Sequence, residues 1–412
     1  MAETVTITAL GHSGDGVAES PGGRVFVPFT LPGETVAIER AGERGRVTQI
    51  IEPSPDRVPP VCRHFGDCGN CALEHMARSA YLAWKRDQVA AAFAQRGIDV
   101  AVEAVVPIGL GARRRAIFSA VRSAKGVVLG YHRRNSKEIV PITECAVLAP
   151  SIVAKLPLLA EIAGRLLRPG KPARVTVVAA DNGLDIAVEG GAKLSRSLLE
   201  GIGRFAADPG LARLTVDGME VIANRRPVIG AGGATLFPVP GGFLQAAAHA
   251  EEALAEAVLS HVGDAAPVAD LFAGIGTFTL RLARRAAVTA VEGDPGLLAG
   301  LEAAVRRGSG LKPVATRKRD LFQNPLAARE LDAFGAVVFD PPAAGAKAQA
   351  EALAASSVAK VAAVSCNPAT LARDLPLFLN AGYAVTRLQP MDMFPHSYHV
   401  EALLHLRRVP PA

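Results

Sequence analysis

From about residue 248 onward, the sequence alternates between helical stretches and short, mostly apolar runs. The apolar runs lie at residues 266–272, 287–294, 334–342 and 360–368, and a more polar predicted strand lies at 312–320. Strands that are buried on both faces and separated by helices form a parallel sheet covered by helices. This part of the chain is therefore predicted to be a doubly wound α/β domain, which binds ligands at the carboxyl ends of its strands.

The upstream part of the 412-residue chain has a different pattern. Residues 1–55 consist of short β-rich runs between Gly- and Pro-containing turns, which predicts a small barrel of four or five strands. A Pro-rich linker at 52–61 leads to a helical run over 72–97, and residues 105–240 mix strands with a helix at 149–167. The length suits two to three domains, and we predict three. Their boundaries are 1–55, 56–240 and 241–412.

Acidic residues stand at the ends of successive predicted strands. Asp270 lies near the end of the first, before the glycines of DLFAGIGTFT, and Glu292, Asp320 and Asp340 end the next three. A dinucleotide fingerprint would need a third glycine where Thr279 stands, which disfavours NAD. A carboxylate at position 292 can accept hydrogen bonds from both ribose hydroxyls. The series is typical of class I S-adenosylmethionine (SAM) methyltransferases, although some of these acids could simply cap helices.

A cysteine, Cys366, ends the fifth predicted strand in the sequence VSCNP. Buried cysteines are common and need no function. At this edge, however, a thiolate could add to carbon 6 of a uracil and make carbon 5 nucleophilic enough to take a methyl group. A base must then remove the carbon 5 proton, and Glu401 lies in an apolar run near the C-terminus. Burial should raise the pKa of Glu401; the alternative role for this acid is a salt bridge.

The other four cysteines are candidate metal ligands. Cys62, Cys68 and Cys71 are spaced C-x5-C-x2-C, and Cys145 lies alone further along the chain. Four thiolates can hold a [4Fe–4S] cluster or a zinc ion, and the spacing does not decide between them. The paired C-x2-C pattern of many zinc sites is missing, which favours iron–sulfur.

The net charge of +6 is concentrated in one segment. Residues 105–145 contain eight Lys or Arg and two acids, and the remainder is neutral. A basic surface suits a phosphate backbone, so this segment, including Arg113, Arg114 and Arg115, is a candidate RNA-binding surface; a solvated strand face is the alternative. No apolar stretch could span a membrane, the first residues do not resemble a secretory signal, and five cysteines make no disulfide framework. We therefore expect a cytoplasmic protein.

Together these motifs resemble those of the RNA 5-methyluridine methyltransferases, especially the iron–sulfur-containing bacterial 23S rRNA enzymes. The resemblance covers nearly the whole chain. The segment up to VPPVC resembles a TRAM domain, an RNA-binding β-barrel, and CRHFGDCGNC resembles the cluster motif. The catalytic domain is matched in order and spacing by FLQA, DLFAGIGTFTL, VEGD, FDPPAAG, VSCNPATLARD and DMFPHSYHVE.

The resemblance implies a role for each candidate residue. Cys366 would be the nucleophile and Glu401 the base. The ligands of a [4Fe–4S] cluster would be Cys62, Cys68, Cys71 and Cys145. The SAM site would be lined by Gln245, Phe272, Thr277, Glu292, Asp320 and Asp340, the last of which would also lie near the target base.

The sequence departs from the family's pattern at a few positions. Ala343 stands where many members have Arg, so a phosphate or base contact there is lost or supplied by Lys347. Thr277 and Asp320 stand where some members have Asn, which affects fine substrate contacts rather than the reaction. The family also implies that a helix at about 73–104 packs on the catalytic domain and makes the central domain discontinuous.

The predicted function is SAM-dependent methylation of uridine carbon 5 in a structured RNA, with 23S rRNA as the leading substrate. The same reaction on tRNA is one alternative. A non-enzymatic RNA-binding factor with a degenerate methyltransferase domain is another, and the intact Cys366 and Glu401 disfavour it. We expect a monomer with no membrane partner.

Overall fold

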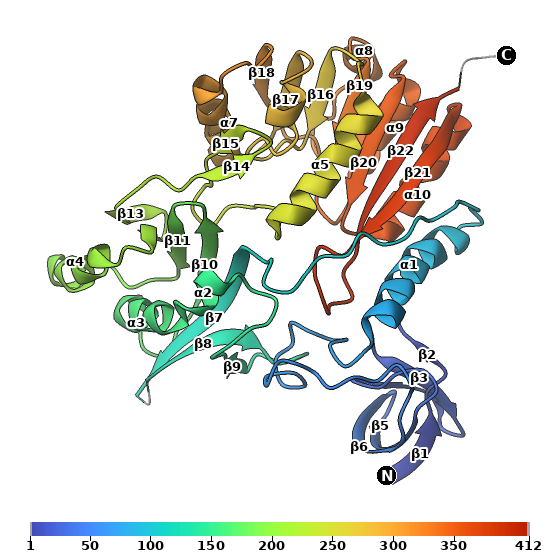
Figure 1. Cartoon of the computed structure of the whole chain (residues 1–412), viewed down its shortest axis with the longest axis vertical. Coiled ribbons are helices and arrows are strands. Elements are labelled where there is room, and N and C mark those ends of the chain that lie inside the picture. Colours follow the sequence, from blue (N-terminus) through green and yellow to red (C-terminus); the bar gives the residue numbers. More distant parts are fainter. Residues whose placement is uncertain (1, 125, 410–412) are drawn as a thin grey trace.

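The computed structural model describes residues 2–124 and 126–409, which form three main sheets (Figure 1). The C-terminal sheet has the strand order β18-β17-β16-β19-β20-β22-β21, and β22 alone runs antiparallel to its neighbours. Its strands are β16 (Val268–Leu271), β17 (Val288–Glu292), β18 (Val314–Lys318), β19 (Ala336–Phe339), β20 (Lys360–Ser365), β21 (Tyr383–Met391) and β22 (Glu401–Arg408).

Helices cover both faces of this sheet, which confirms the doubly wound fold. α9 (Lys347–Ala355) and α10 (Pro368–Asn380) pack on one face with Val337, and α5 (Ala248–Val262) packs on the other with Val338. Neighbouring residues of β19 therefore face opposite helical layers. The chain leaves β16 on one side and returns to β19 on the other, so the switch point that favours ligand binding lies between them. The remaining helices of this part are α6 (Thr279–Leu282), α7 (Pro295–Arg307) and α8 (Ala328–Leu331).

The N-terminal part forms a small barrel of six strands, one more than expected. Two consecutive strands, β1 and β2, pair with opposite edges of the sheet, β5 and β3, and this closes the sheet on itself. Apolar side chains such as Val25 and Ile38 fill the interior. The strands are β1 (Ala2–Thr6), β2 (Ala9–Leu10), β3 (Gly16–Ser20), β4 (Gly23–Val27), β5 (Thr35–Ala41) and β6 (Arg44–Glu52).

The central sheet has the order β13-β12-β11-β10-β7-β8-β9 and carries α3 on one face. The single helix expected over 149–167 is two helices, because Pro157 lacks an N–H and its ring would clash with the carbonyl of Val153. Its elements are β7 (Arg115–Ser123), β8 (Gly126–His132), β9 (Ile139–Pro141), α2 (Pro150–Val153), α3 (Leu156–Leu166), β10 (Pro172–Ala180), β11 (Gly183–Glu189), α4 (Arg196–Gly203), η1 (Arg204–Ala207), β12 (Leu211–Val216) and β13 (Met219–Ala223); a short hairpin, β14 (Ile229–Ala231) and β15 (Ala234–Leu236), follows.

Helix α1 (Arg78–Ala94) is shorter than the helical run expected over 72–97 and the helix expected at about 73–104. The backbone N–H groups of Ala72 and Leu73 donate to the carbonyl of His396, so the residues before Arg78 are held by another segment instead of starting the helix. After Gly97 the chain runs beside β21, where the N–H of Glu103 donates to Leu388. The helical stretch that follows the first predicted strand of the C-terminal part is likewise short and has only the four residues of α6.

Helix α1 lies between the barrel and the C-terminal sheet (Figure 1). Its Val89 and Phe93 are fully buried in the same apolar cluster as α9 and α10. We propose that α1 belongs to the catalytic domain, so that the domain 56–240 is interrupted by it. None of the described helices is long and apolar enough to cross a membrane.

A buried charge network joins the central sheet to the C-terminal sheet. Glu251 on α5 is 1% exposed and accepts hydrogen bonds from Arg114, before β7, at 2.6 Å and from Arg281 on α6 at 3.2 Å. Arg114 also donates to the carbonyl of Gln245, and Arg281 donates to that of Thr277. One carboxylate therefore ties together two segments that the sequence assigns to the SAM site.

We expect Glu251→Ala to lower the free energy of unfolding by about 3–5 kcal/mol, because it leaves the Arg114 guanidinium buried without its partner. The matched control is Glu252→Ala, which removes the neighbouring, 45% exposed partner of Arg281 and should cost about 0–1 kcal/mol. Urea denaturation followed by circular dichroism measures both. Equal midpoints for the two variants would contradict the role of the network.

Candidate active site

The sheet topology brings Cys366, Asp340 and Glu401 to one edge. Asp340 directly follows β19 and Cys366 directly follows β20. Because β22 runs antiparallel to β20, with Ser365 opposite Ala402, the start of β22 lies beside the end of β20. Glu401 is the first residue of β22, so the thiol and the two carboxyls from distant parts of the chain share one site.

Cys366 is half-buried and lines an open cavity of about 500 Å³. One wall comes from residues 394–400, before Glu401, and another from Arg113 and the cysteine-containing loop at Gly69 and Asn70. His12 reaches the cavity from the barrel. All three parts of the chain therefore contribute to the space in front of the thiol.

The charges at this edge act on one another. Burial above all, together with Glu401 and Asp340 as negative neighbours, raises the pKa of the Cys366 thiol to about 11. Burial raises the pKa of Asp340 to about 7. Burial, together with Asp340, holds the pKa of Glu401 well above its usual value. Within the described part of the chain no Lys, Arg or His pairs with Glu401, so the salt bridge considered as its alternative role does not form there.

The loop after β16 provides a second polar region at the same edge. Asp270 is fully buried; one carboxylate oxygen accepts from the Thr279 hydroxyl at 2.5 Å, and the other, Oδ1, has no hydrogen-bond partner among the described residues. Burial raises the pKa of Asp270 to about 7. A Cβ on Gly276 would lie 2.5 Å from Leu301, so only glycine fits this loop. An unsatisfied buried oxygen beside a glycine loop with open space at Gly274 fits a bound polar ligand such as SAM.

The acids predicted to bind SAM are engaged with backbone groups. Glu292 accepts from the N–H of Gly274 and of Asp294, each at 2.8 Å, and Asp320 accepts from the N–H of Phe322 at 2.9 Å. The carboxylate oxygens of Glu292 and of Asp320 keep lone pairs that can accept hydrogen bonds from a ligand. Asp294 itself caps α7.

The other predicted SAM residues lie around this loop. Gln245 donates to Asp340 over 3.5 Å, and Phe272 has a left-handed backbone, with φ of 62°. The ring of Phe272 packs against that of Phe322, 5.3 Å away between centroids. Phe322 and Phe243 are 47% and 60% exposed. The sequence analysis gave neither residue a role, although Phe243 opens the FLQA motif; an aromatic residue two positions from a predicted ligand-binding residue would have been the signal.

The four remaining cysteines line a single small cavity, together with Glu74 and Tyr131; they are Cys62, Cys68, Cys71 and Cys145. Burial above all raises the pKa of each thiol, that of Cys68 to about 11, and neighbouring thiolates add to the shift. Among the residues that the structure describes, no group of three or more His, Cys, Asp or Glu side chains is arranged to hold a metal ion.

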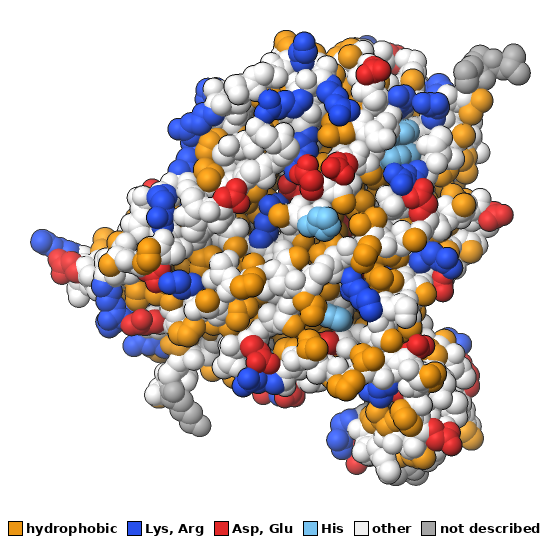
Figure 2. Space-filling model, viewed as in Figure 1, with side chains coloured by type: hydrophobic (Ala, Val, Ile, Leu, Met, Phe, Trp, Pro, Cys, Tyr) orange, Lys and Arg blue, Asp and Glu red, His pale blue; other side chains and the backbone are white. Residues whose placement is uncertain are grey.

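The arginines predicted to bind RNA are mostly engaged inside the protein. Arg114 is buried in the Glu251 network, and Arg115 donates to the carbonyl of Gly242 at 3.0 Å. Arg113 lies over the ring of Phe394. The prediction of a basic face is therefore wrong for Arg114 and Arg115, whose guanidinium groups bind partners within the protein, whereas Arg113 lines the Cys366 cavity. Lys and Arg side chains are scattered over the face that Figure 2 shows, and Lys125 of the same segment lies outside the described residues.

A second open cavity, of about 580 Å³, adjoins the first and shares Gly69, Asn70 and Tyr398 with it. Its cationic residues come from the barrel and from the β8–β9 turn, and they are Arg44, Arg133, Arg134 and Lys137. Asp15 is buried between Arg44 and Arg134, at 2.8 Å from each. The two cavities together form an open groove from the thiol to the junction of the barrel and the central sheet, and its second half is polar.

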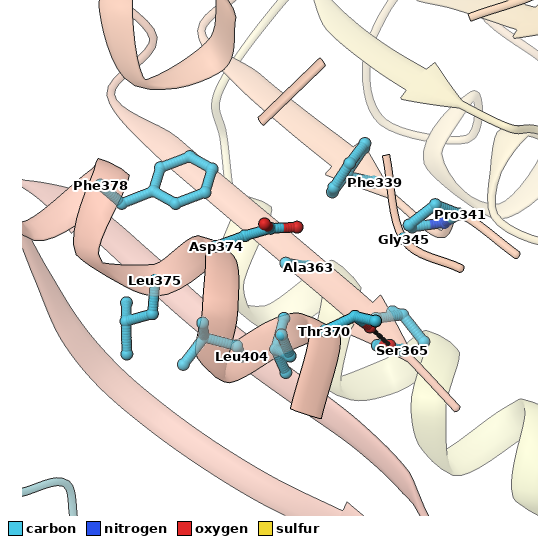
Figure 3. A pocket seen from close by; sticks show the side chains of 12 residues that line it. Phe339, Pro341, Gly345, Ala363, Ser365, Thr370, Asp374, Leu375, Phe378 and Leu404 are labelled. Carbon is cyan, nitrogen blue, oxygen red and sulfur yellow. Dashed lines mark hydrogen bonds between the residues drawn. The ribbon is translucent and has the colours of Figure 1, made fainter. Parts of the chain in front are cut away.

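A third cavity lies behind Cys366, between α10 and strands β19 and β20 (Figure 3). Phe339, Leu375 and Phe378 line it, and Ser365 and Thr370 share a hydrogen bond at its rim. Its free space of about 10 Å³ holds at most one water molecule, so it is a packing feature rather than a ligand site.

Comparisons with known proteins indicate the family of the chain. A family model described as tRNA (Uracil-5-)-methyltransferase matches residues 315–409, and a TRAM domain model matches residues 3–39. An uncharacterized RNA methyltransferase of Brucella suis is 46% identical over 98% of this chain and 97% of its own length. A 23S rRNA (uracil(1939)-C(5))-methyltransferase of Edwardsiella ictaluri is 35% identical over 97% of this chain and 94% of its own.

A solved structure has the same fold. The tRNA (uracil-54, C5)-methyltransferase of Pyrococcus abyssi, in complex with S-adenosyl-L-homocysteine, matches with a TM-score of 0.74 over 98% of this chain and 99% of that chain. The two sequences are 20% identical, so the likeness concerns the arrangement of all three parts of the chain rather than individual side chains.

We expect the alkylation of Cys366 by iodoacetamide in the free protein to be slow at pH 8 and to accelerate as the pH rises toward 11. The thiolate is the reactive form, and burial beside two carboxyls raises the thiol pKa to about 11. Mass spectrometry of the peptide containing Cys366 gives the rate, with Cys366→Ala as the blank. A rate that is already maximal at pH 8 would contradict the raised pKa.

Proposed function

The chain belongs to the RNA (uracil-5-)-methyltransferase family with an N-terminal TRAM domain, and we propose that it transfers a methyl group from SAM to carbon 5 of a uridine in RNA. The observation that carries the proposal is the meeting of Cys366 and Glu401 beside one open cavity. A nucleophile and a base are the two groups that this reaction requires of the protein.

We propose that Cys366 and Glu401 act in sequence. The Cys366 thiolate adds to carbon 6 of the uracil, and the electron pair of the C5–C6 double bond moves onto carbon 5 and the carbon 4 carbonyl. When bound, SAM supplies an electrophilic methyl group, which carbon 5 takes. Glu401 then accepts the carbon 5 proton, and the released electron pair expels the Cys366 thiolate. The raised pKa of Glu401 supports this role, because a carboxylate with a higher pKa is a stronger base.

For the SAM site we propose the residues around the β16 loop and the neighbouring strand ends. The unsatisfied oxygen of Asp270 and the remaining lone pairs of Glu292 and Asp320 support this location. The full set of proposed contacts is Gln245, Phe272, Thr277, Glu292, Asp320 and Asp340. Asp340 also lies within electrostatic reach of Cys366, which suits a residue near the target base.

We propose that RNA lies along the two adjoining cavities, from Cys366 to the barrel. The cationic residues of the second cavity support this path, since phosphate groups bind Lys and Arg. The leading substrate is 23S rRNA, as in the Edwardsiella relative, and tRNA is the second candidate because the solved structure with this fold acts on tRNA. We also propose that the chain acts as a monomer in the cytoplasm, since its own residues supply the nucleophile, the base and the groove.

Mapping 5-methyluridine by mass spectrometry in rRNA and tRNA from a deletion strain decides between these substrates. Loss of one 5-methyluridine from 23S rRNA is the result expected. Loss of 5-methyluridine from tRNA alone would instead make tRNA the proposed substrate.

We propose that Cys62, Cys68, Cys71 and Cys145 hold a [4Fe–4S] cluster. Four thiols around one cavity have the donor chemistry of such a site, and bound iron would stabilise the thiolate forms that burial above all disfavours. The missing paired C-x2-C pattern favours the cluster over zinc.

We expect Glu401→Gln to stop the reaction after methyl transfer, because the amide cannot accept the carbon 5 proton. A covalent protein–RNA band carrying label from methyl-labelled SAM should accumulate with ordinary uridine RNA, whereas the wild type releases its product. The readout is denaturing electrophoresis followed by autoradiography.

Cys366→Ala is the control for that experiment, since it should form no adduct, even with 5-fluorouracil RNA, and still bind SAM. Normal turnover by Glu401→Gln would remove Glu401 from the proposed role. An RNA adduct in Cys366→Ala would place the nucleophile elsewhere.

We expect protein purified without oxygen to be brown and to contain about four iron atoms per chain. Iron analysis and the visible absorption spectrum measure this, and Cys145→Ser should lower both. Colourless protein with one zinc ion per chain would contradict the cluster.

A further inference from the structure

The loop that joins β21 to β22 forms one wall of the Cys366 cavity. We call residues 392–400 the cavity wall segment. Phe394, Ser397, Tyr398 and His399 of this segment line the cavity, and its last residue, Val400, precedes Glu401. The shape of the segment therefore sets both the space for the target uracil of the RNA and the position of Glu401.

A lysine on another element holds this segment at both of its ends. Lys85 on α1 is fully buried, and its Nζ donates to Asp392 Oδ1 and to the carbonyl of His399, each at 2.5 Å, and to the carbonyl of Phe394 at 3.2 Å. An ammonium group has three N–H donors, so the cavity wall segment accounts for all of them. The two ends of the segment are thus fixed to one point on α1.

Two further residues of α1 hold the same carboxylate. The Tyr81 hydroxyl donates to Asp392 Oδ1 at 2.8 Å, and Arg78 donates to Asp392 Oδ2 at 3.0 Å. The middle of the segment is held by the chain just before α1, where the N–H groups of Ala72 and Leu73 reach His396. The segment is therefore held mainly by residues 72–85, outside the sheet that carries Cys366.

Stability alone does not explain a lysine at this position. A fully buried ion pair loses most of its Coulomb energy to desolvation, and well-packed apolar residues often stabilise as well or better. Burial lowers the pKa of Lys85 to about 8 despite Asp392, which shows how strongly the site penalises the charge. What an apolar residue could not supply is a directed set of three hydrogen bonds to one loop.

We propose that Lys85 is a positioning residue for the methyl-transfer reaction: it sets the conformation of the cavity wall segment and thereby the binding of the target RNA and the placement of Glu401. This inference rests on the proposed function. Lys85 lines neither the cavity nor the β16 loop, so its effect reaches the RNA side of the site and leaves the SAM side unchanged.

The test compares Lys85→Met with Lys155→Met in the full chain. Methionine keeps the length of the side chain and removes its charge. Lys155, just before α3, pairs with Asp208, just after η1, and neither residue lines the cavity, so its variant controls for the loss of a lysine–aspartate pair. Tyr81→Phe removes one hydrogen bond to Asp392 without a charge and serves as the milder variant if Lys85→Met does not fold.

Hydrogen–deuterium exchange gives a readout that does not depend on activity. Peptides covering residues 392–400 should exchange faster in Lys85→Met and in Tyr81→Phe, while peptides covering β16 and β17 keep the wild-type rate. In methylation assays the KM for RNA should rise, or kcat should fall, by about tenfold to a hundredfold in Lys85→Met, since small misplacements near reacting groups have effects of this size. The dissociation constant of SAM should stay within about twofold, and Tyr81→Phe should show a smaller change of the same kind.

Two results would overturn the inference. One is wild-type exchange in the segment together with wild-type KM and kcat in folded Lys85→Met or Tyr81→Phe. The other is a parallel loss of SAM binding and RNA methylation, or an equal loss in Lys155→Met, because each indicates general destabilisation. Absence of methylation by the wild-type protein would instead refute the proposed function, and the exchange result would still decide whether Lys85 holds the segment.

Discussion

The antiparallel pairing of β22 with β20 is the contact on which the proposed chemistry depends. It brings the first residue of β22 beside the residue that follows β20, so Glu401 and Cys366 meet although 34 residues separate them. The parallel neighbour β19 adds Asp340 at the same edge. Burial raises the pKa values of Asp340, Cys366 and Glu401. The higher pKa makes the carboxylate of Glu401 a stronger base, which helps it to take a proton from carbon.

Buried ion pairs connect this edge to the rest of the molecule. Glu251 joins Arg114 of the central part to Arg281 beside the β16 loop, and Asp392 joins the cavity wall segment to α1. Asp15 of the barrel holds Arg134 of the β8–β9 turn. Each pair crosses between parts of the chain that are distant in sequence. An ion pair requires a particular distance and orientation between its two charged groups. It therefore restricts the relative positions of two elements more than an apolar contact does. An active site assembled from three parts of the chain requires such restricted positions.

Part of the fold and of the site could be predicted from the sequence because the signals are local. The alternation of apolar runs and helices predicted the doubly wound sheet, and the residues at strand ends, among them Cys366 and Asp340, fall where strand endings place them. Gly97, where the sequence predicted the end of the helical run, has the left-handed φ of 68° that is common after a helix, although α1 itself ends at Ala94. Such features depend on a residue and its near neighbours, and a single sequence contains both.

By contrast, only the tertiary structure decided which polar side chains are buried and which groups they pair with. The sequence predicted a basic surface that includes Arg114 and Arg115. In the structure both side chains point into the interior, because their hydrogen-bond partners are carbonyls and a carboxylate more than a hundred residues away. Helix α1 starts late because His396 takes the amides of Ala72 and Leu73. The three acceptors of Lys85 likewise lie more than three hundred residues downstream. By itself the sequence determined which elements form and which residues end them; the pairing of charges across those elements depends on contacts between distant segments, which exist only once the chain is folded.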